Sequence, residues 1–307
     1  MSMRVTFLGT SGAVPTTQRA PSAVLVHRDG ERYLFDCGEG TQRQMMRFGT
    51  GFDVSHIFVT HLHGDHVLGI PGLIQSWDFN DRTAPLSIHV PPGSRADVEA
   101  LVNAAGYRPG YPVRIHEVPP GEVALDADEF EIRTFRTEHR TRSTGYALVE
   151  ADRPGRFDRG KAEELGVPVG PKFGKLHEGE PVELEDGRTI HPDQVVGEPR
   201  PGRTFVYTGD TRPLSTTAEV AADADLLVHD CTFASDEASR AKQTGHSTAR
   251  EAGEVAARAD AKRLALTHIS SRYAGDVSHL EREARDAFDG DCFVASDGQK
   301  VDVPYPE

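Results

Sequence analysis

Four potential metal ligands lie within six residues of one another in the first third of the chain. His61, His63, Asp65 and His66 follow the β-rich run Ser55–Thr60. Alternate side chains of an extended segment point the same way, and the intervening glycine lets the second pair approach from the other side. Three imidazoles and a carboxylate are costly to bury together without a cation. The alternative, a solvated histidine cluster on the surface, is disfavoured by four ligands at one strand end.

Three further candidate ligands lie far from this cluster in the sequence. His139, Asp210 and His268 each come just after a segment whose residue types predict a β-strand. Asp36 ends another predicted strand and precedes the glycine-rich stretch Cys37–Gly40. An aspartate or histidine at one strand end is more often a turn cap, so each position alone indicates little. Together with the cluster, however, the three complete a set of seven possible ligands. Such nitrogen and oxygen ligands suit zinc first, with manganese or iron as substitutes.

The elements that must position these residues come in two similar runs of strands and helices. Residues 1–149 and 204–303 therefore predict one α/β domain, an αββα sandwich of two packed sheets with helices outside. Apolar spacing predicts a helix over His66–Trp77 that is distorted near Pro71. A second helix is expected over Ser94–Ala105, capped by Ser94.

The stretch between these runs, residues 151–203, is rich in glycine, proline and charge and shows little apolar periodicity. It predicts an irregular insertion in the single domain formed by residues 1–307. Between Arg153 and Lys175 six bases oppose three acids, a local surplus of +3. The alternative is a disordered insertion whose charges are merely solvated. Acidic residues dominate the rest of the segment, from Glu178 to Asp186, and should face away from any nucleic acid.

The whole chain is strongly acidic, since 34 Lys+Arg against 48 Asp+Glu give a net charge of −14. Only six of the bases are lysine, and three of these lie in the insertion. An acidic surface poor in lysine favours a halophilic protein that works in concentrated salt, with an ordinary acidic enzyme as the alternative. Net charge alone argues against a nucleic-acid partner, so any such partner must be held by locally basic segments.

Nothing in the sequence indicates a membrane or an oxidising compartment. No apolar run approaches the roughly 20 residues that span a bilayer, and the N-terminus lacks the apolar stretch of a signal peptide. Cys37, Cys231 and Cys292 have no paired spacing. We therefore expect a soluble cytoplasmic protein with no membrane partner.

The cluster at residues 61–66 resembles the H-x-H-x-D-H motif of the metallo-β-lactamase superfamily, and Asp36-Cys37-Gly38-Glu39-Gly40 resembles its first motif. The resemblance implies the metallo-β-lactamase fold and two metal ions about 4 Å apart that activate water near neutral pH. Asp36 would accept a hydrogen bond from a metal-bound histidine and fix its tautomer. The implied ligands are His61, His63 and His139 for one ion, Asp65, His66 and His268 for the other, and Asp210 for both.

Finer motifs, including Gly209-Asp210-Thr211-Arg212 and Gly245-His246-Ser247-Thr248, resemble the ribonuclease Z family, endonucleases that cut the 3′ trailer from precursor tRNA. The resemblance implies a hydrolase in which Asp65 helps to take the proton from the attacking water and His246 protonates the leaving group. The turn at residue 246 could also be structural, because Ser247 or Thr248 could cap the next helix. The products would be a tRNA 3′-hydroxyl and a trailer 5′-phosphate.

The insertion also resembles this family, whose flexible arm holds the tRNA elbow through a glycine-proline tip. The resemblance implies that Gly170, Pro171, Lys172 and Lys175 bind the substrate. Because the arm must reach an elbow far from the cut, we expect a homodimer in which one subunit clamps while the other cuts. Asp230 departs from the family, which usually has a glutamate there, so its position beside the site depends on a side chain one methylene shorter.

Two other functions are compatible with this set of residues. One is a small-molecule phosphodiesterase or sulfatase on the same scaffold, which the basic arm disfavours. The other is a metal-stabilised tRNA-binding protein without catalysis, which the complete ligand set disfavours.

Overall fold

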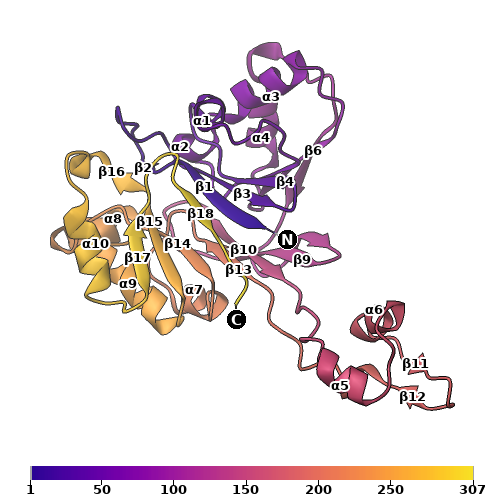
Figure 1. Ribbon diagram of the computed structural model, residues 1–307. Helices are drawn as coiled ribbons and strands as arrows, with labels where there is room; N and C mark the ends of the chain where they lie inside the picture. Colours follow the sequence, from indigo (N-terminus) through magenta and orange to yellow (C-terminus); the bar gives the residue numbers. More distant parts are fainter. Residues whose placement is uncertain (1, 307) are drawn as a thin grey trace. The chain divides into compact units, whose positions relative to one another are not determined.

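The computed structural model describes residues 2–306, and within them the main strands form two seven-stranded sheets (Figure 1). The first sheet has the order β18-β1-β3-β4-β5-β6-β7 and the second the order β17-β15-β14-β13-β10-β9-β8. The strands of the first are β1 (Met3–Gly9), β3 (Ala23–Arg28), β4 (Glu31–Phe35), β5 (His56–Phe58), β6 (Leu86–Val90), β7 (Val113–Glu117) and β18 (Lys300–Asp302). Those of the second are β8 (Val123–Ala127), β9 (Phe130–Arg136), β10 (Thr144–Glu150), β13 (Thr204–Tyr207), β14 (Leu226–Asp230), β15 (Arg263–Thr267) and β17 (Asp291–Val294).

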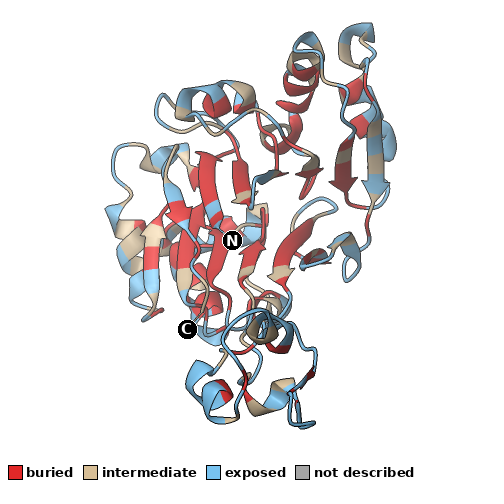
Figure 2. Cartoon of the chain, turned by 45° about the vertical axis from the view of Figure 1, so that its right-hand side comes forward, coloured by how far each residue is buried: buried red, intermediate tan, exposed pale blue. Residues whose placement is uncertain are grey.

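Alternating apolar side chains build three apolar layers around these sheets. In β14, Leu226 and Val228 face the other sheet, whereas Leu227 packs against helices outside. Helices α1, α3 and α4 cover the first sheet and α7, α9 and α10 the second, so the expected αββα sandwich is confirmed (Figures 1 and 2). None of the helices in residues 2–306 is long and apolar enough to cross a membrane. The helices of this unit are α1 (Thr41–Phe48), α2 (Gly64–Val67), α3 (Ile70–Phe79), α4 (Arg95–Val102), α7 (Ser215–Val220), α8 (Ala238–Thr244), α9 (Ala249–Arg258) and α10 (Ser278–Arg285).

Two predicted helices differ from the observed ones. The prediction of a single helix over His66–Trp77 is wrong, because α2 ends before α3 begins. Pro71 lies in the first turn of α3, where its missing N–H costs no intrahelical hydrogen bond. Ser94 precedes α4, but its side chain makes no cap. Instead the carboxylate of Glu117, from β7, accepts hydrogen bonds from the backbone N–H groups of Ser94 and Arg95.

Four neighbouring strands of each sheet are parallel, and the loops that follow several of them carry the candidate site residues. Strands β4, β5, β6 and β7 are parallel neighbours, as are β13, β14, β15 and β17. The carboxyl ends of parallel strands lie at one edge of a sheet, so the loops that follow them meet there. Asp36 follows β4 directly, and Asp230 is the last residue of β14.

Residues 150–203 and 305–306 form a second compact unit, which we call the arm. It has its own apolar core, so the expectation of an irregular segment without apolar order is wrong. Two antiparallel bridges, Arg153 to Arg200 and Phe157 to Val196, join the entering and leaving chains. The core side chains are Ala162, Val167, Leu176, Val182, Leu184, Ile190 and Val195. The elements of the arm are α5 (Arg159–Glu164), α6 (Pro171–His177), β11 (Val182–Glu183) and β12 (Thr189–Ile190).

Candidate metal centre

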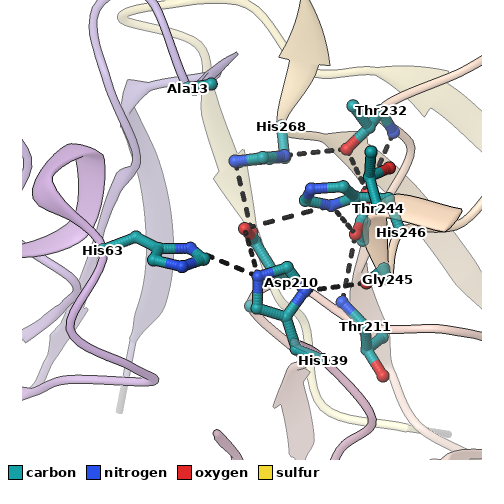
Figure 3. Close-up of polar contacts among 12 residues, drawn as sticks. Ala13, His63, His139, Asp210, Thr211, Thr232, Thr244, Gly245, His246 and His268 are labelled. Atoms are coloured by element: carbon teal, nitrogen blue, oxygen red, sulfur yellow. Dashed lines mark hydrogen bonds and ion pairs between the residues drawn. The ribbon is translucent and has the colours of Figure 1, made fainter. Parts of the chain in front are cut away.

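Loops that follow β5, β9, β13 and β15 bring the seven candidate ligands together, as Figure 3 shows for His63, His139, Asp210 and His268. A first group joins His61, His63, His139 and Asp210, whose ligand atoms all lie within 4.8 Å of one another. Nδ1 of His63 is 3.0 Å from Nε2 of His61 and 3.2 Å from Nε2 of His139. Oδ2 of Asp210 lies 3.5 Å from Nε2 of His61. These atoms enclose a position suited to one cation.

A second group joins Asp65, His66 and His268 around the other oxygen of Asp210. Oδ1 of Asp210 lies 3.3 Å from Nε2 of His66 and 3.2 Å from Nε2 of His268. Oδ2 of Asp65 is 3.2 Å from the same His268 nitrogen and accepts a 2.8 Å hydrogen bond from the N–H of Ala13. Asp210 therefore presents one oxygen to each group.

The chemistry of these atoms fits a pair of cations. Nε2 of His66 and Oδ1 of Asp210 are buried without a hydrogen-bond partner among the described residues, an arrangement that costs free energy unless a cation satisfies both. Burial raises the pKa of Asp210, but His268, His66 and His61 outweigh burial and hold it well below the usual value. The carboxylate is thus ionised. Asp65, whose pKa the imidazoles of His268 and His66 lower against the effect of burial, supplies a second carboxylate beside these atoms, and bound cations would offset the negative charge gathered there.

Asp36 orients two of the histidines. Its Oδ2 lies 2.7 Å from Nδ1 of His66, so that ring donates its Nδ1–H and turns Nε2 toward the second group. The hydroxyl of Thr60 donates to Asp36 and lies 3.0 Å from Nδ1 of His61. Because that hydroxyl has a single proton, it accepts from His61, whose Nε2 then faces the first group. Burial keeps the pKa of His61 well below its usual value, which favours the neutral ligand form.

Asp230 repeats this pattern on the other sheet. Its Oδ2 lies 2.8 Å from Nδ1 of His246, so the shorter side chain does reach the site. Its Oδ1 accepts a 2.6 Å hydrogen bond from the hydroxyl of Thr232, which is 2.8 Å from Nδ1 of His268 (Figure 3). By the same argument His268 donates to Thr232 and directs Nε2 to the second group. Each buried aspartate therefore orients one histidine directly and one through a threonine.

The remaining two histidines are held differently. Nδ1 of His139 lies 2.8 Å from the carbonyl oxygen of Gly245, which leaves Nε2 for the first group. His63 turns Nδ1 rather than Nε2 toward that group. The ligand atoms of Asp210, Asp230, His246 and His268 also lie close together. We interpret that set as a hydrogen-bond network, because Asp230 already occupies Nδ1 of His246.

Two neighbouring carboxylates favour the protonated form of His246. Burial lowers its pKa, but the carboxylates of Asp230 and Asp210 outweigh burial and raise the pKa to about 9. Its side chain is 13% exposed, so the ring reaches solvent. The expected helix cap is also present, because the side chain of Thr248 accepts a hydrogen bond from the N–H of Glu251. The turn is therefore both the start of α9 and the support of the His246 imidazole beside the candidate ligands.

Close backbone contacts complete the site. Residue 268 has φ 61°, a left-handed conformation that is uncommon for residues other than glycine. A Cβ at Gly12 would come 2.8 Å from Nδ1 of this histidine, so only glycine fits there. Gly209, with φ +60°, similarly packs against Thr60. Sequence reasoning missed Thr60 and Thr232, although each lies within two residues of a candidate site residue.

Comparisons with known proteins agree with this geometry. Residues 16–268 match the model of the metallo-beta-lactamase superfamily. The chain is 71% identical over 307 residues to a ribonuclease Z of Haloferax volcanii, covering 100% of this chain and 97% of that protein. It is 49% identical to a ribonuclease Z of Myxococcus xanthus, covering 98% of each. Among solved structures, the short form of human tRNase Z superposes with a TM-score of 0.71 at 26% identity, covering 98% of this chain and 99% of that one.

Proposed function

Because the chain belongs to the ribonuclease Z family of the metallo-β-lactamase superfamily, metal-dependent endonucleases of tRNA 3′ processing, we propose that it cuts the 3′ trailer from precursor tRNA with two zinc ions. The observation that carries this proposal is the position of Asp210, with one carboxylate oxygen facing each ligand group. Two groups joined by one carboxylate are the arrangement that a dinuclear phosphodiesterase needs. Manganese or iron would be accepted by the same nitrogen and oxygen ligands.

The reaction we propose is hydrolysis of one phosphodiester bond. Bound cations would neutralise the scissile phosphate and make water more acidic. The oxygen of a water molecule attacks phosphorus, and Asp65 helps to remove its proton. The bond between phosphorus and the 3′-oxygen of the tRNA breaks, and His246 gives its proton to that oxygen. A tRNA 3′-hydroxyl and a trailer 5′-phosphate result.

Mapping the product ends tests this proposal. The protein, stripped with a chelator and then reloaded with zinc, is incubated with precursor tRNA that carries a 3′ trailer. We expect cleavage only after reloading, with a 3′-hydroxyl on the tRNA and a 5′-phosphate on the trailer. Uncut precursor at full zinc occupancy would contradict the proposal and favour a metal-stabilised binding protein. Rapid hydrolysis of a chromogenic diester with no action on precursor tRNA would favour the small-molecule phosphodiesterase.

We propose that the arm binds tRNA through its exposed bases. Arg156, Lys161 and Lys175 are exposed, as are Gly170 and Pro171. Not every base of this segment is equally available. The ammonium group of Lys172 donates a 2.7 Å hydrogen bond to the carbonyl of Glu183, and Arg159 pairs with Glu163 at 2.7 Å. Contacts between the exposed bases and RNA phosphates would recognise the shape of the RNA rather than its base sequence.

We propose further that two copies pair through an apolar groove between α1 and α3. Met46 and Phe79, which line it, are 70% and 89% exposed, and Phe52 and Tyr107 also contribute. Exposed apolar groups gathered in one groove indicate a protein contact. A two-fold pair would cover the same groove on both copies.

We also propose a cytoplasmic location. The three cysteines Cys37, Cys231 and Cys292 are buried and free, which fits a protein of a reducing compartment.

Replacing Phe79 by aspartate should weaken this dimer. Truncation of a central aromatic contact costs about 2 kcal/mol or more, so the dissociation constant should rise roughly thirtyfold. Sedimentation velocity over a range of concentrations measures the change. Val123→Asp, at another exposed apolar position on β8, is the matched control and should leave the dimer intact. A monomeric wild-type protein, or an unchanged dissociation constant for Phe79→Asp, would contradict the assignment.

A further inference from the structure

The short segment Thr211–Arg212 connects three turns that carry functional groups. It follows Asp210 directly, and the N–H of Arg212 donates a 2.8 Å hydrogen bond to the carbonyl of Glu138, which precedes His139. In return the N–H of Glu138 lies 3.1 Å from the hydroxyl of Thr211. The turn with the bridging carboxylate and the turn with His139 are thus held together by reciprocal hydrogen bonds.

The same segment also holds the turn at residue 246. The hydroxyl of Ser247 donates a 2.6 Å hydrogen bond to the carbonyl of Thr211. The guanidinium of Arg212 donates to the carbonyl of His246 itself. Asp230 also belongs to this network. Its Oδ2 accepts a 3.0 Å hydrogen bond from the N–H of Thr211 and lies 2.8 Å from Nδ1 of His246. The imidazole is therefore fixed at its ring by Asp230 and at its backbone by Arg212.

The guanidinium of Arg212 is itself locked in place by Glu251. Both of its terminal nitrogens donate to this carboxylate, and one of the two contacts is 3.0 Å long. Both side chains are mostly covered, with 15% and 23% exposure. Glu251 also accepts a 2.9 Å hydrogen bond from the N–H of Thr248 as part of the capping box of α9. The planar guanidinium donates to both carboxylate oxygens of Glu251 and to the His246 carbonyl at the same time. The single ammonium group of a lysine cannot reproduce this geometry.

We propose that Arg212 is a positioning residue for leaving-group protonation, acting through the backbone of His246. The inference rests on the proposed role of His246 as the proton donor. Arg212 contacts no ligand atom of either metal group through its side chain. Its replacement should therefore displace the donor while both cations remain bound. Arg212 and Glu251 would together tie the start of α9 to the turn that carries Asp210.

Leaving-group replacement tests this role. Two substrates are compared under single-turnover conditions: precursor tRNA with the natural 3′-oxygen at the cut, and the same RNA with a 3′-sulfur there. A thiol is acidic, with a pKa of about 8.5 in cysteine, and departs without a proton donor. Arg212→Lys should cleave the oxygen substrate about tenfold more slowly, as expected when a supporting residue is replaced. His246→Ala should lose about a hundredfold or more. Both deficits should largely disappear with sulfur, and metal content should stay unchanged.

Further variants keep the inference falsifiable. Glu251→Gln preserves the capping box, which accepts glutamine, but weakens the hold on Arg212, so it should show the same sulfur rescue. Arg250 lies on α9 beside Glu251 but forms an exposed ion pair with Asp286. Arg250→Lys is therefore the matched control and should cleave both substrates normally. Equal losses on both substrates for Arg212→Lys and Glu251→Gln, with His246→Ala rescued by sulfur, would overturn the role of Arg212 alone. No loss or no rescue for His246→Ala would overturn the proton-donor assignment and this inference together.

Discussion

Replacing Asp210 by asparagine should reduce cleavage of precursor tRNA by about a thousandfold or more. Bound metal contributes several kcal/mol of transition-state stabilisation, and each 1.36 kcal/mol is a factor of ten in rate. Asparagine preserves the size of the side chain but removes the charge and one of the two oxygens that face the ligand groups. Single-turnover cleavage measures the rate, and elemental analysis of the purified variant should find fewer than two metal ions per chain.

Asp225→Asn is the matched control for this prediction. Asp225, which directly precedes β14, is also buried, but it accepts hydrogen bonds from the N–H of Thr204 and from the ammonium of Lys262 rather than facing the candidate ligands. Its replacement should lower the free energy of unfolding by about 1–3 kcal/mol, the cost of unmaking a buried polar contact, without loss of metal or activity. If Asp210→Asn keeps two ions and cuts at the wild-type rate, the bridging role is wrong.

Excising the arm should impair cleavage of precursor tRNA about a hundredfold while leaving hydrolysis of a small diester unchanged. The bridge between Arg153 and Arg200, with N–O distances of 2.7 and 2.9 Å, is a natural place to close the chain with a short glycine-serine linker. Two charge-assisted hydrogen bonds to phosphate contribute about 3 kcal/mol together, and 1.4 kcal/mol is a factor of ten in binding. The comparison of kcat/KM for precursor tRNA and for a chromogenic diester measures both effects.

The salt dependence of binding gives a second measure of the arm. For each phosphate that the shortened protein no longer neutralises, the slope of log K against log salt should become shallower by roughly 0.7–0.9. Lys175→Ala should reproduce part of this change within the intact arm. Glu178→Gln and Glu180→Gln, on the acidic side, are controls that should leave the slope unchanged. Equal losses on precursor tRNA and on the small diester would show that excision damages the catalytic site rather than a separate tRNA-binding surface.

The candidate metal ligands were visible in the sequence because their types are unusual there. Histidines and aspartates collected after predicted strands, and the structure brings all seven candidate ligands into two adjoining groups. The αββα architecture was predictable for a similar reason, since apolar periodicity is a local property of each strand and helix. The arm was found by its composition. Its apolar core was not, because core residues such as Val167 and Ile190 lie far apart in the sequence and show no single period.

What the tertiary structure alone decided is the orientation of each functional atom. The residue types name His61, His66, His139 and His268 as ligands, but not which nitrogen each ring presents. That choice depends on acceptors that lie elsewhere: a threonine hydroxyl, the Asp36 carboxylate and the carbonyl of Gly245, 106 residues from His139. The same holds for the start of α4, which we expected Ser94 to cap. The N–H groups of Ser94 and Arg95 donate instead to the carboxylate of Glu117 on β7.

The cluster at residues 61–66 shows the division most clearly. Sequence alone predicted a cation site in this segment, because three imidazoles and a carboxylate so close together have few other uses. Only the fold decided that Asp210 turns one oxygen to each group, that Asp230 serves both His246 and His268, and that Arg212 connects them. Hydrogen bonds are short and directional, so they are set by where distant strands end rather than by the residues that surround each group in the chain.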